Sequence, residues 1–186
     1  MKFRYAGKYT DESQLGRRPD PEGFVPFREP QDLKKFSMIA NGLAIVLIVI
    51  FLILVKLRSH GADFNLIGII LSLVCMVPHE FLHAIWFRED VTMYNGLSQG
   101  LLFVYGTEDM TKARFVIMSL CPNIVLGLIP FVIFMFVPSL TLLGTLGAVS
   151  LGAGMGDYIN IFNCLTQVPK GALVYMNGLH TYWYNK

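Results

Sequence analysis

His79 and His83, with Glu80 between them, form a His-Glu-x-x-His motif inside a strongly apolar stretch. On a helix, residues four apart lie on the same face, so both imidazoles can reach one tetrahedral metal at about 2.0–2.1 Å. Glu80 then flanks that metal without binding it, where it can take a proton from a metal-bound water as in metallopeptidases. An accidental match, or two satisfied core histidines, is the alternative. Because each of these polar groups is costly in a lipid-buried segment, the motif favours a site.

A catalytic zinc needs a third protein ligand, and Asp157 is our choice because it is a carboxylate in another apolar segment. His60 and His180 compete for this role but lie outside the apolar segments, and Cys75, four residues before His79, is a possible thiolate ligand. At 1.5 Å per residue, the predicted spans place His83 and His79 roughly 6 and 12 Å deep and Asp157 roughly 8 Å deep. The candidate ligands therefore fall at one level.

Two asparagines and a short apolar run are further candidates for binding substrate or supporting a ligand. Asn123 is polar at membrane depth, where it can hydrogen-bond substrate or a metal ligand; hydrogen bonding between helices is the commoner use. Asn160 is a candidate for the same role. The apolar run is Leu102, Phe103 and Val104.

The composition indicates that these residues belong to a polytopic membrane protein. Of 186 residues, 54% are hydrophobic and 15% charged, with a mean hydropathy of +0.52, which is typical of a membrane protein. The net charge of +2, without a basic stripe, argues against nucleic acid as a partner. The three cysteines all lie in apolar segments and are typical of packing residues.

The apolar segments predict an all-α membrane domain over residues 37–163 with about four transmembrane helices, since roughly 20 apolar residues cross a bilayer. Prolines within the second and third segments predict kinks. Glycines in the fourth, Gly144 to Gly156, favour close helix packing. The four predicted spans are 37–57, 64–87, 113–137 and 139–162.

The remaining segments are predicted as two tails and a hairpin. Residues 1–36 are polar and proline-rich and predict a solvated N-terminal tail, and residues 164–186 predict an interfacial C-terminal tail with a hairpin turning at Asn177-Gly178. Residues 91–106 predict a hairpin turning at Asn95-Gly96. Its apolar second arm either enters the membrane as a re-entrant element, packs over the site and pairs with an extended substrate, or is a simple packing hairpin.

The positive charges predict the orientation. Thirteen of the fifteen Lys and Arg residues lie on one side of a four-span topology. By the positive-inside rule, we expect a multi-pass cell-membrane protein with both termini in the cytoplasm.

Three stretches resemble the DUF3267 family of zincin-type peptidases, which is itself similar to site-2-protease-type intramembrane metalloproteases. These are His79-Glu80-x-x-His83, Pro122-Asn123 and Gly156-Asp157. The resemblance covers about residues 64–175. It implies a three-helix catalytic core that opens to the cytoplasm, one Zn²⁺ per chain held by His79, His83 and Asp157, and Glu80 as general base. Site-2 proteases carry an Asn-Pro…Asp-Gly pattern at the third ligand, whereas this chain has Gly156-Asp157-Tyr158.

We therefore predict a zinc metalloprotease that hydrolyses a peptide bond in or near the bilayer. Its expected partners are membrane lipid and a membrane-associated protein or peptide substrate. A catalytically silent metal-binding or regulatory membrane protein is the first alternative. A small metal transporter is the second, and it would need more polar residues in the outer half of the spans.

Overall fold

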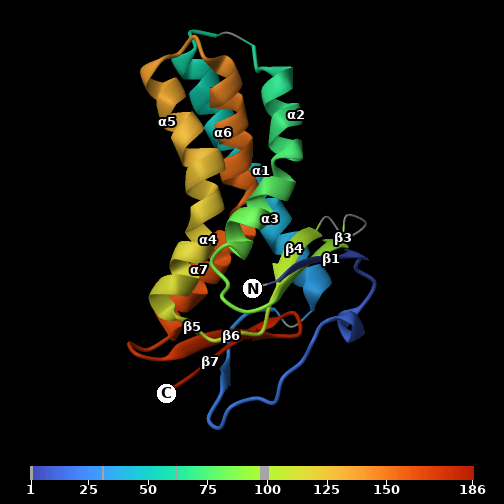
Figure 1. The fold of residues 1–186 in the computed structure, drawn as a ribbon. Coiled ribbons are helices and arrows are strands. Elements are labelled where there is room, and N and C mark those ends of the chain that lie inside the picture. Colours follow the sequence, from blue (N-terminus) through green and yellow to red (C-terminus); the bar gives the residue numbers. More distant parts are fainter. Residues whose placement is uncertain (1, 31, 62, 97–100) are drawn as a thin grey trace.

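A computed structural model describes residues 2–30, 32–61, 63–96 and 101–186. A bundle of helices stands at one end, and two small sheets lie at the other, next to both termini (Figure 1). The helices are α1 (Leu33–Arg58), α2 (Leu66–Val74), α3 (Met76–Ala84), α4 (Lys112–Pro122), α5 (Ile129–Phe136), α6 (Thr141–Ala153) and α7 (Met155–Gln167), with a π-helical stretch, η3 (Asn123–Leu128), between α4 and α5.

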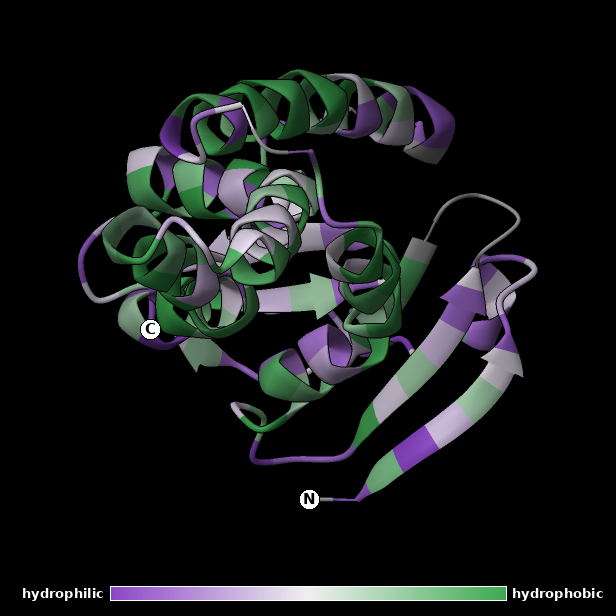
Figure 2. Ribbon diagram, turned by 90° about the horizontal axis from the view of Figure 1, so that it is seen from above, coloured by the Kyte–Doolittle hydropathy of each residue, from purple (hydrophilic) through white to green (hydrophobic). Residues whose placement is uncertain are grey.

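Three helical stretches of the described residues are long and apolar enough to cross a membrane: 34–58, 66–84 and 112–136. The apolar helix over 141–153 is shorter. Seen along the bundle, hydrophobic residues dominate the helices, whereas the strands are mixed and hydrophilic residues are frequent in the links (Figure 2). The structure therefore supports a mostly helical membrane protein, and the count of four spans stays a prediction.

The expectation of an all-α fold is wrong, because strands form two sheets. In one sheet, β3 (Val91–Gly96) lies between β1 (Phe3–Lys8), parallel to it, and β4 (Leu101–Tyr105), antiparallel to it. The other sheet is antiparallel, with the order β2 (Val25–Pro26), β7 (His180–Tyr184), β6 (Leu173–Asn177) and β5 (Met110–Thr111). In each sheet, strands from distant parts of the chain join a local hairpin, and no local pattern predicts that these distant strands pair with it.

The two predicted hairpins are present, with shifted turns. Asn95 and Gly96 belong to β3 and pair with Leu102 and Leu101, so the predicted turn there is wrong. The connection, residues 97–100, lies outside the described residues. In the C-terminal hairpin Asn177 pairs with His180, so the turn falls one residue later than predicted, on Gly178-Leu179. Gly178 has φ +67°, a left-handed conformation that glycine adopts without strain.

The expectation of a solvated N-terminal tail is also wrong, because part of this segment is folded against the sheets. Besides β1, this segment buries Tyr9 and Leu15 against Tyr94 and Tyr105 of the β3–β4 hairpin. Burial of these aromatic rings provides the hydrophobic stabilisation that a polar tail lacks. The N-terminal segment is therefore part of the folded body next to the sheets.

Three predicted helices are interrupted, two of them next to a proline. Pro78 cannot donate to the carbonyl of Val74, and the second segment breaks at Cys75 into α2 and α3. The third carries η3 directly after Pro122. The segment predicted as one helix over 139–162 is instead divided at Gly154 into α6 and α7.

α6 is the central helix of the bundle and packs against α1, α2 and α5. Its glycines allow close approach, as predicted: a Cβ on Gly144 would lie 2.6 Å from the Phe134 ring, and one on Gly152 would lie 2.2 Å from Ile48. Gly156 is different, since nothing lies within 4 Å of its would-be Cβ.

Candidate metal centre

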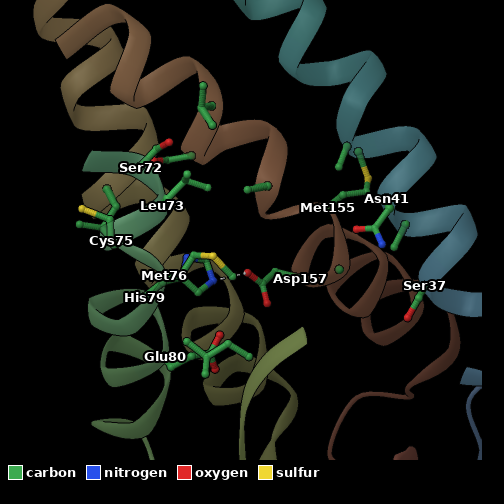
Figure 3. Close-up of a pocket in the computed structure, with 18 of the residues that line it drawn as sticks. Ser37, Asn41, Ser72, Leu73, Cys75, Met76, His79, Glu80, Met155 and Asp157 are labelled. Carbon is green, nitrogen blue, oxygen red and sulfur yellow. Dashed lines mark hydrogen bonds and ion pairs between the residues drawn. The ribbon is translucent and has the colours of Figure 1, made fainter. Parts of the chain in front are cut away.

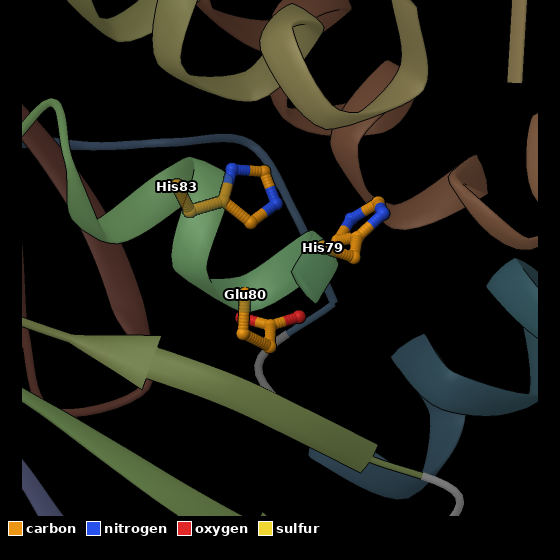
Figure 4. A group of neighbouring side chains, drawn as sticks. All are labelled: His79, Glu80 and His83. Atoms are coloured by element: carbon orange, nitrogen blue, oxygen red, sulfur yellow. The ribbon is translucent and has the colours of Figure 1, made fainter. Parts of the chain in front are cut away.

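Helix α3 presents His79, Glu80 and His83 together at the lower end of the bundle. The two histidines lie one turn apart, and the ligand atoms of the three residues lie within 4.8 Å of one another (Figure 4). Glu80 and His83 are buried, with 8% and 7% of their surface exposed, and His79 is half-buried. The helical spacing read from the sequence therefore produces a cluster of metal-binding groups.

Asp157 reaches this cluster from α7. Its Oδ2 lies 3.1 Å from Nε2 of His79, and its Oδ1 lies 3.2 Å from Nε2 of His83. Figure 3 shows His79 and Asp157 facing each other from different helices. Two ligands at about 2.0–2.1 Å from a tetrahedral ion lie about 3.3–3.4 Å apart. The two oxygen–nitrogen distances are close to this separation, and imidazole nitrogen and carboxylate oxygen are atoms that zinc binds.

Neighbouring groups orient these side chains. Nδ1 of His83 lies 3.0 Å from the carbonyl of Met118, which can only accept, so Nδ1 carries the proton and Nε2 is free to bind a metal. Asn123 donates from Nδ2 to Asp157 Oδ2 at 2.7 Å and to the carbonyl of Ser119 at 2.9 Å. Asn123 therefore supports the carboxylate directly, which is one of the two roles considered for it.

Glu80 lies between the two imidazoles and the hairpin. Its Oε2 accepts a hydrogen bond of 2.9 Å from the backbone N–H of Val104 in β4. Since this N–H is bonded to Glu80 and not to β3, it lies on the outer edge of β4. Backbone groups alternate along a strand, so those of Leu102 face the same side. The outer edge of β4 thus lines the cluster.

Two cavities meet at the cluster. One, of about 240 Å³, extends from His79 and Glu80 to α1. The other, of about 210 Å³, extends toward the C-terminal hairpin and is lined by the remaining candidates, Asn160, Leu102, Phe103 and Val104. Glu80 and Asp157 line both cavities. A molecule at the cluster can therefore be contacted from two sides.

The alternative ligands do not join the cluster among the described residues. His60 lies in the link between α1 and α2, and His180 lies on β7, 3.8 Å from Glu29. Cys75 is a free cysteine that lines the larger cavity, and among the described residues its thiol makes no hydrogen bond to His79, His83 or Asp157.

Two groups at this site could not be found from the sequence. The Met118 carbonyl is a backbone group that any residue type would supply. Gly154 allows Asn123 to approach, since a Cβ there would lie 1.6 Å from Asn123 Oδ1. A glycine in a helical segment indicates close packing, but it does not indicate against which side chain.

A family model described as "Putative zincin peptidase", DUF3267, matches residues 72–173. No curated protein and no solved structure matches the chain. The matched range contains α3, Asp157 and the β3–β4 hairpin, whereas α1, β1, β2 and β7 lie outside it.

Proposed function

Since more than half of the chain matches the DUF3267 model, the chain belongs to this family of zincin-type peptidases, and we propose that it is an intramembrane zinc metalloprotease. The observation that carries this proposal is the convergence of His79, His83 and Asp157, with oxygen–nitrogen distances of 3.1 and 3.2 Å, beside Glu80. A packing role would not require two imidazoles and a carboxylate at one point of an apolar bundle.

His79, His83 and Asp157 would hold one Zn²⁺ per chain. When bound, zinc lowers the pKa of a water molecule and polarises the scissile carbonyl. Glu80 takes a proton from the attacking water and delivers it to the leaving amine. The Val104 N–H binds one oxygen of Glu80, which fixes the carboxylate and leaves its second oxygen for this proton transfer.

The outer edge of β4 supports a role in binding the substrate. Leu102 and Val104 present backbone groups toward the cluster, and an extended peptide can add to such an edge through main-chain hydrogen bonds. Side chains that alternate along the bound peptide would then face the smaller cavity, with Phe103 and Asn160 in its wall.

We expect the site to lie within or beside a membrane. Three helical stretches are apolar enough to span it, and α3, which carries Glu80, is the end of one of them. We propose four spans, both termini in the cytoplasm, a site opening to that side as in site-2-protease-type enzymes, and a membrane-associated protein or peptide as substrate.

Metal content tests the ligand set. In detergent-purified protein, we expect about one zinc per chain in the wild type and in Glu80→Gln, and its loss in His79→Ala and Asp157→Ala. The measurement is elemental analysis by mass spectrometry. Zinc retained in Asp157→Ala would remove Asp157 from the ligand set.

Hydrolysis of a quenched-fluorescent peptide library tests the catalytic role. Removing a general base costs about 10²- to 10⁴-fold in rate, so we expect Glu80→Gln to bind zinc and to lose hydrolysis by that factor. A zinc-loaded Glu80→Gln protein as active as the wild type would overturn the proposal and leave a metal-binding membrane protein.

A further inference from the structure

The larger cavity reaches well beyond the metal ligands. It extends from His79 and Asp157 to α1, which forms its opposite wall with Ser37, Ala40 and Asn41 (Figure 3). Residues of α2 and of the end of α6 also line it. Its volume of about 240 Å³ corresponds to about eight water molecules at roughly 30 Å³ each, which is enough for a short stretch of peptide.

The wall of this cavity holds two hydroxyl groups that lack partners among the described residues. Ser150 on α6 is 9% exposed, and its Oγ has no hydrogen-bond partner; the buried Oγ of Ser37 on α1 has none either. Asn41 adds an amide to the same wall. Buried polar groups in proteins are nearly always satisfied, so unsatisfied ones in a cavity indicate that a ligand or water completes them.

We infer that this cavity is a specificity subsite, which binds an unwound segment of the peptide substrate beside the scissile bond, with Ser37 and Ser150 as its hydrogen-bonding residues. The inference rests on the proposed function. It assigns one wall of the binding site to α1, a helix that lies outside the range of the family match.

The hydrogen-bonding groups favour a peptide over a lipid chain as the occupant. An acyl chain would fill the volume but leave the hydroxyls of Ser37 and Ser150 without partners. An unwound peptide has free N–H and C=O groups, which are costly in a bilayer unless protein or water satisfies them. The hydroxyls of the cavity wall and the backbone groups of the peptide can therefore hydrogen-bond to each other.

The cavity wall also predicts the size of the bound residues. The wall contains residues with small side chains, which leave space for the bound segment: Ala40, Ala44, Ala153 and Gly156. The subsite therefore suits residues with small side chains, such as alanine, and excludes several bulky ones in a row.

Filling the cavity tests the inference directly. Ala40→Phe places a ring in the cavity, and Gly42→Phe is the matched control, because nothing lies within 4 Å of its would-be Cβ and it is exposed. The probes are a phosphinic tetra-alanine peptide, which carries residues on both sides of a zinc-binding group, and acetohydroxamate, which carries none. Binding to the zinc-loaded protein is measured by calorimetry.

We expect Ala40→Phe to weaken binding of the phosphinic peptide by about tenfold or more and to leave acetohydroxamate unaffected. Gly42→Phe should bind both probes as the wild type does. Equal peptide affinity in Ala40→Phe and wild type would overturn the inference while the proposed function stands. If the zinc-loaded wild type binds neither probe, the proposed function fails as well.

A second pair of variants, with smaller changes, tests the inference independently of whether Ala40→Phe folds. Ser150→Ala removes the buried hydroxyl, and Ser139→Ala removes an exposed one from the link between α5 and α6. We expect only Ser150→Ala to weaken binding of the phosphinic peptide, with zinc content and thermal stability unchanged in both. Unchanged peptide affinity in Ser150→Ala would exclude Ser150 from the subsite.

Discussion

At the scale of single residues, Asp157 is the group on which the candidate centre depends. One carboxylate lies between two imidazoles and accepts from the amide of Asn123. A carboxylate in the middle of an apolar bundle is expensive unless such partners surround it. Asn123 itself is buried, with 3% of its surface exposed, so its amide has little freedom to turn away.

Asn123→Ala should weaken zinc binding without abolishing it. The substitution removes the donor that orients Asp157, and groups that support metal ligands typically contribute about 10- to 100-fold in affinity. The measurement is competition with a zinc chelator. Asn160→Ala is the control, since Asn160 lies in the wall of the smaller cavity and its side chain, among the described residues, makes no hydrogen bond to His79, His83 or Asp157; equal affinities in the two variants would contradict the support role of Asn123.

At the scale of elements, the break between α6 and α7 positions Asp157. α6 ends at Ala153, Gly154 follows, and α7 begins at Met155, so Asp157 lies in the first turn of a new helix. The side chain of Asn123, in η3 on the neighbouring stretch, lies directly against Gly154. The break and the π-helical stretch thus meet at the candidate metal ligands.

Gly154→Ala should therefore disturb the centre through Asn123. The added Cβ would lie 1.6 Å from Asn123 Oδ1, so one of the two elements must move. We expect zinc affinity to fall at least as far as in Asn123→Ala, by about tenfold or more, when the two are compared by the same chelator competition. Gly156→Ala, whose Cβ meets nothing within 4 Å, should retain zinc; equal loss of zinc in both variants would contradict an effect that acts through Asn123.

At the scale of the whole molecule, the N-terminal segment joins the two sheets to each other. β1 pairs with β3, whereas β2 pairs with β7. Arg18 forms a 2.6 Å ion pair with Asp109, and Tyr175 donates to Asp20. The sheets therefore form one folded layer beneath the bundle, held by residues from both ends of the chain.

The contact of Glu29 with β7 makes the stability of the folded state depend on pH. Its carboxylate accepts from the N–H of Thr181 and lies 3.8 Å from His180. Burial raises the pKa of Glu29 above its ordinary value of 4.5, in spite of these favourable partners. The folded state therefore holds this proton more tightly than the unfolded state does, so Glu29 contributes stability at low pH that is lost as pH rises from 4.5 through the raised pKa.

Glu29→Gln should remove this dependence. We expect its melting temperature in detergent to exceed that of the wild type by a few degrees at pH 7, and the two to converge near pH 4. Glu22→Gln, an exposed carboxylate of the same segment, is the control and should follow the wild type. A difference that is the same at both pH values would contradict the explanation.

The sequence by itself determined the motif and the long apolar segments, and it predicted the membrane setting and Asp157 as the third ligand. The spacing of His79 and His83 places them on one face of a helix. Apolar segments of about 20 residues are long enough to cross a membrane. The depth estimate placed Asp157 level with them. These inferences needed only local geometry and the cost of polar groups in lipid.

The tertiary structure alone decided which distant groups complete the site. The N-terminal segment became a strand because β3 was available to pair with it, and the break at Gly154 arose where Asn123 approaches from another helix. Glu80 contacts Val104, and α1 lines the larger cavity. Both contacts join residues that are distant in the sequence. Their cause is packing between elements, and a side chain's partner across such an interface is not encoded by the residues next to it in the chain.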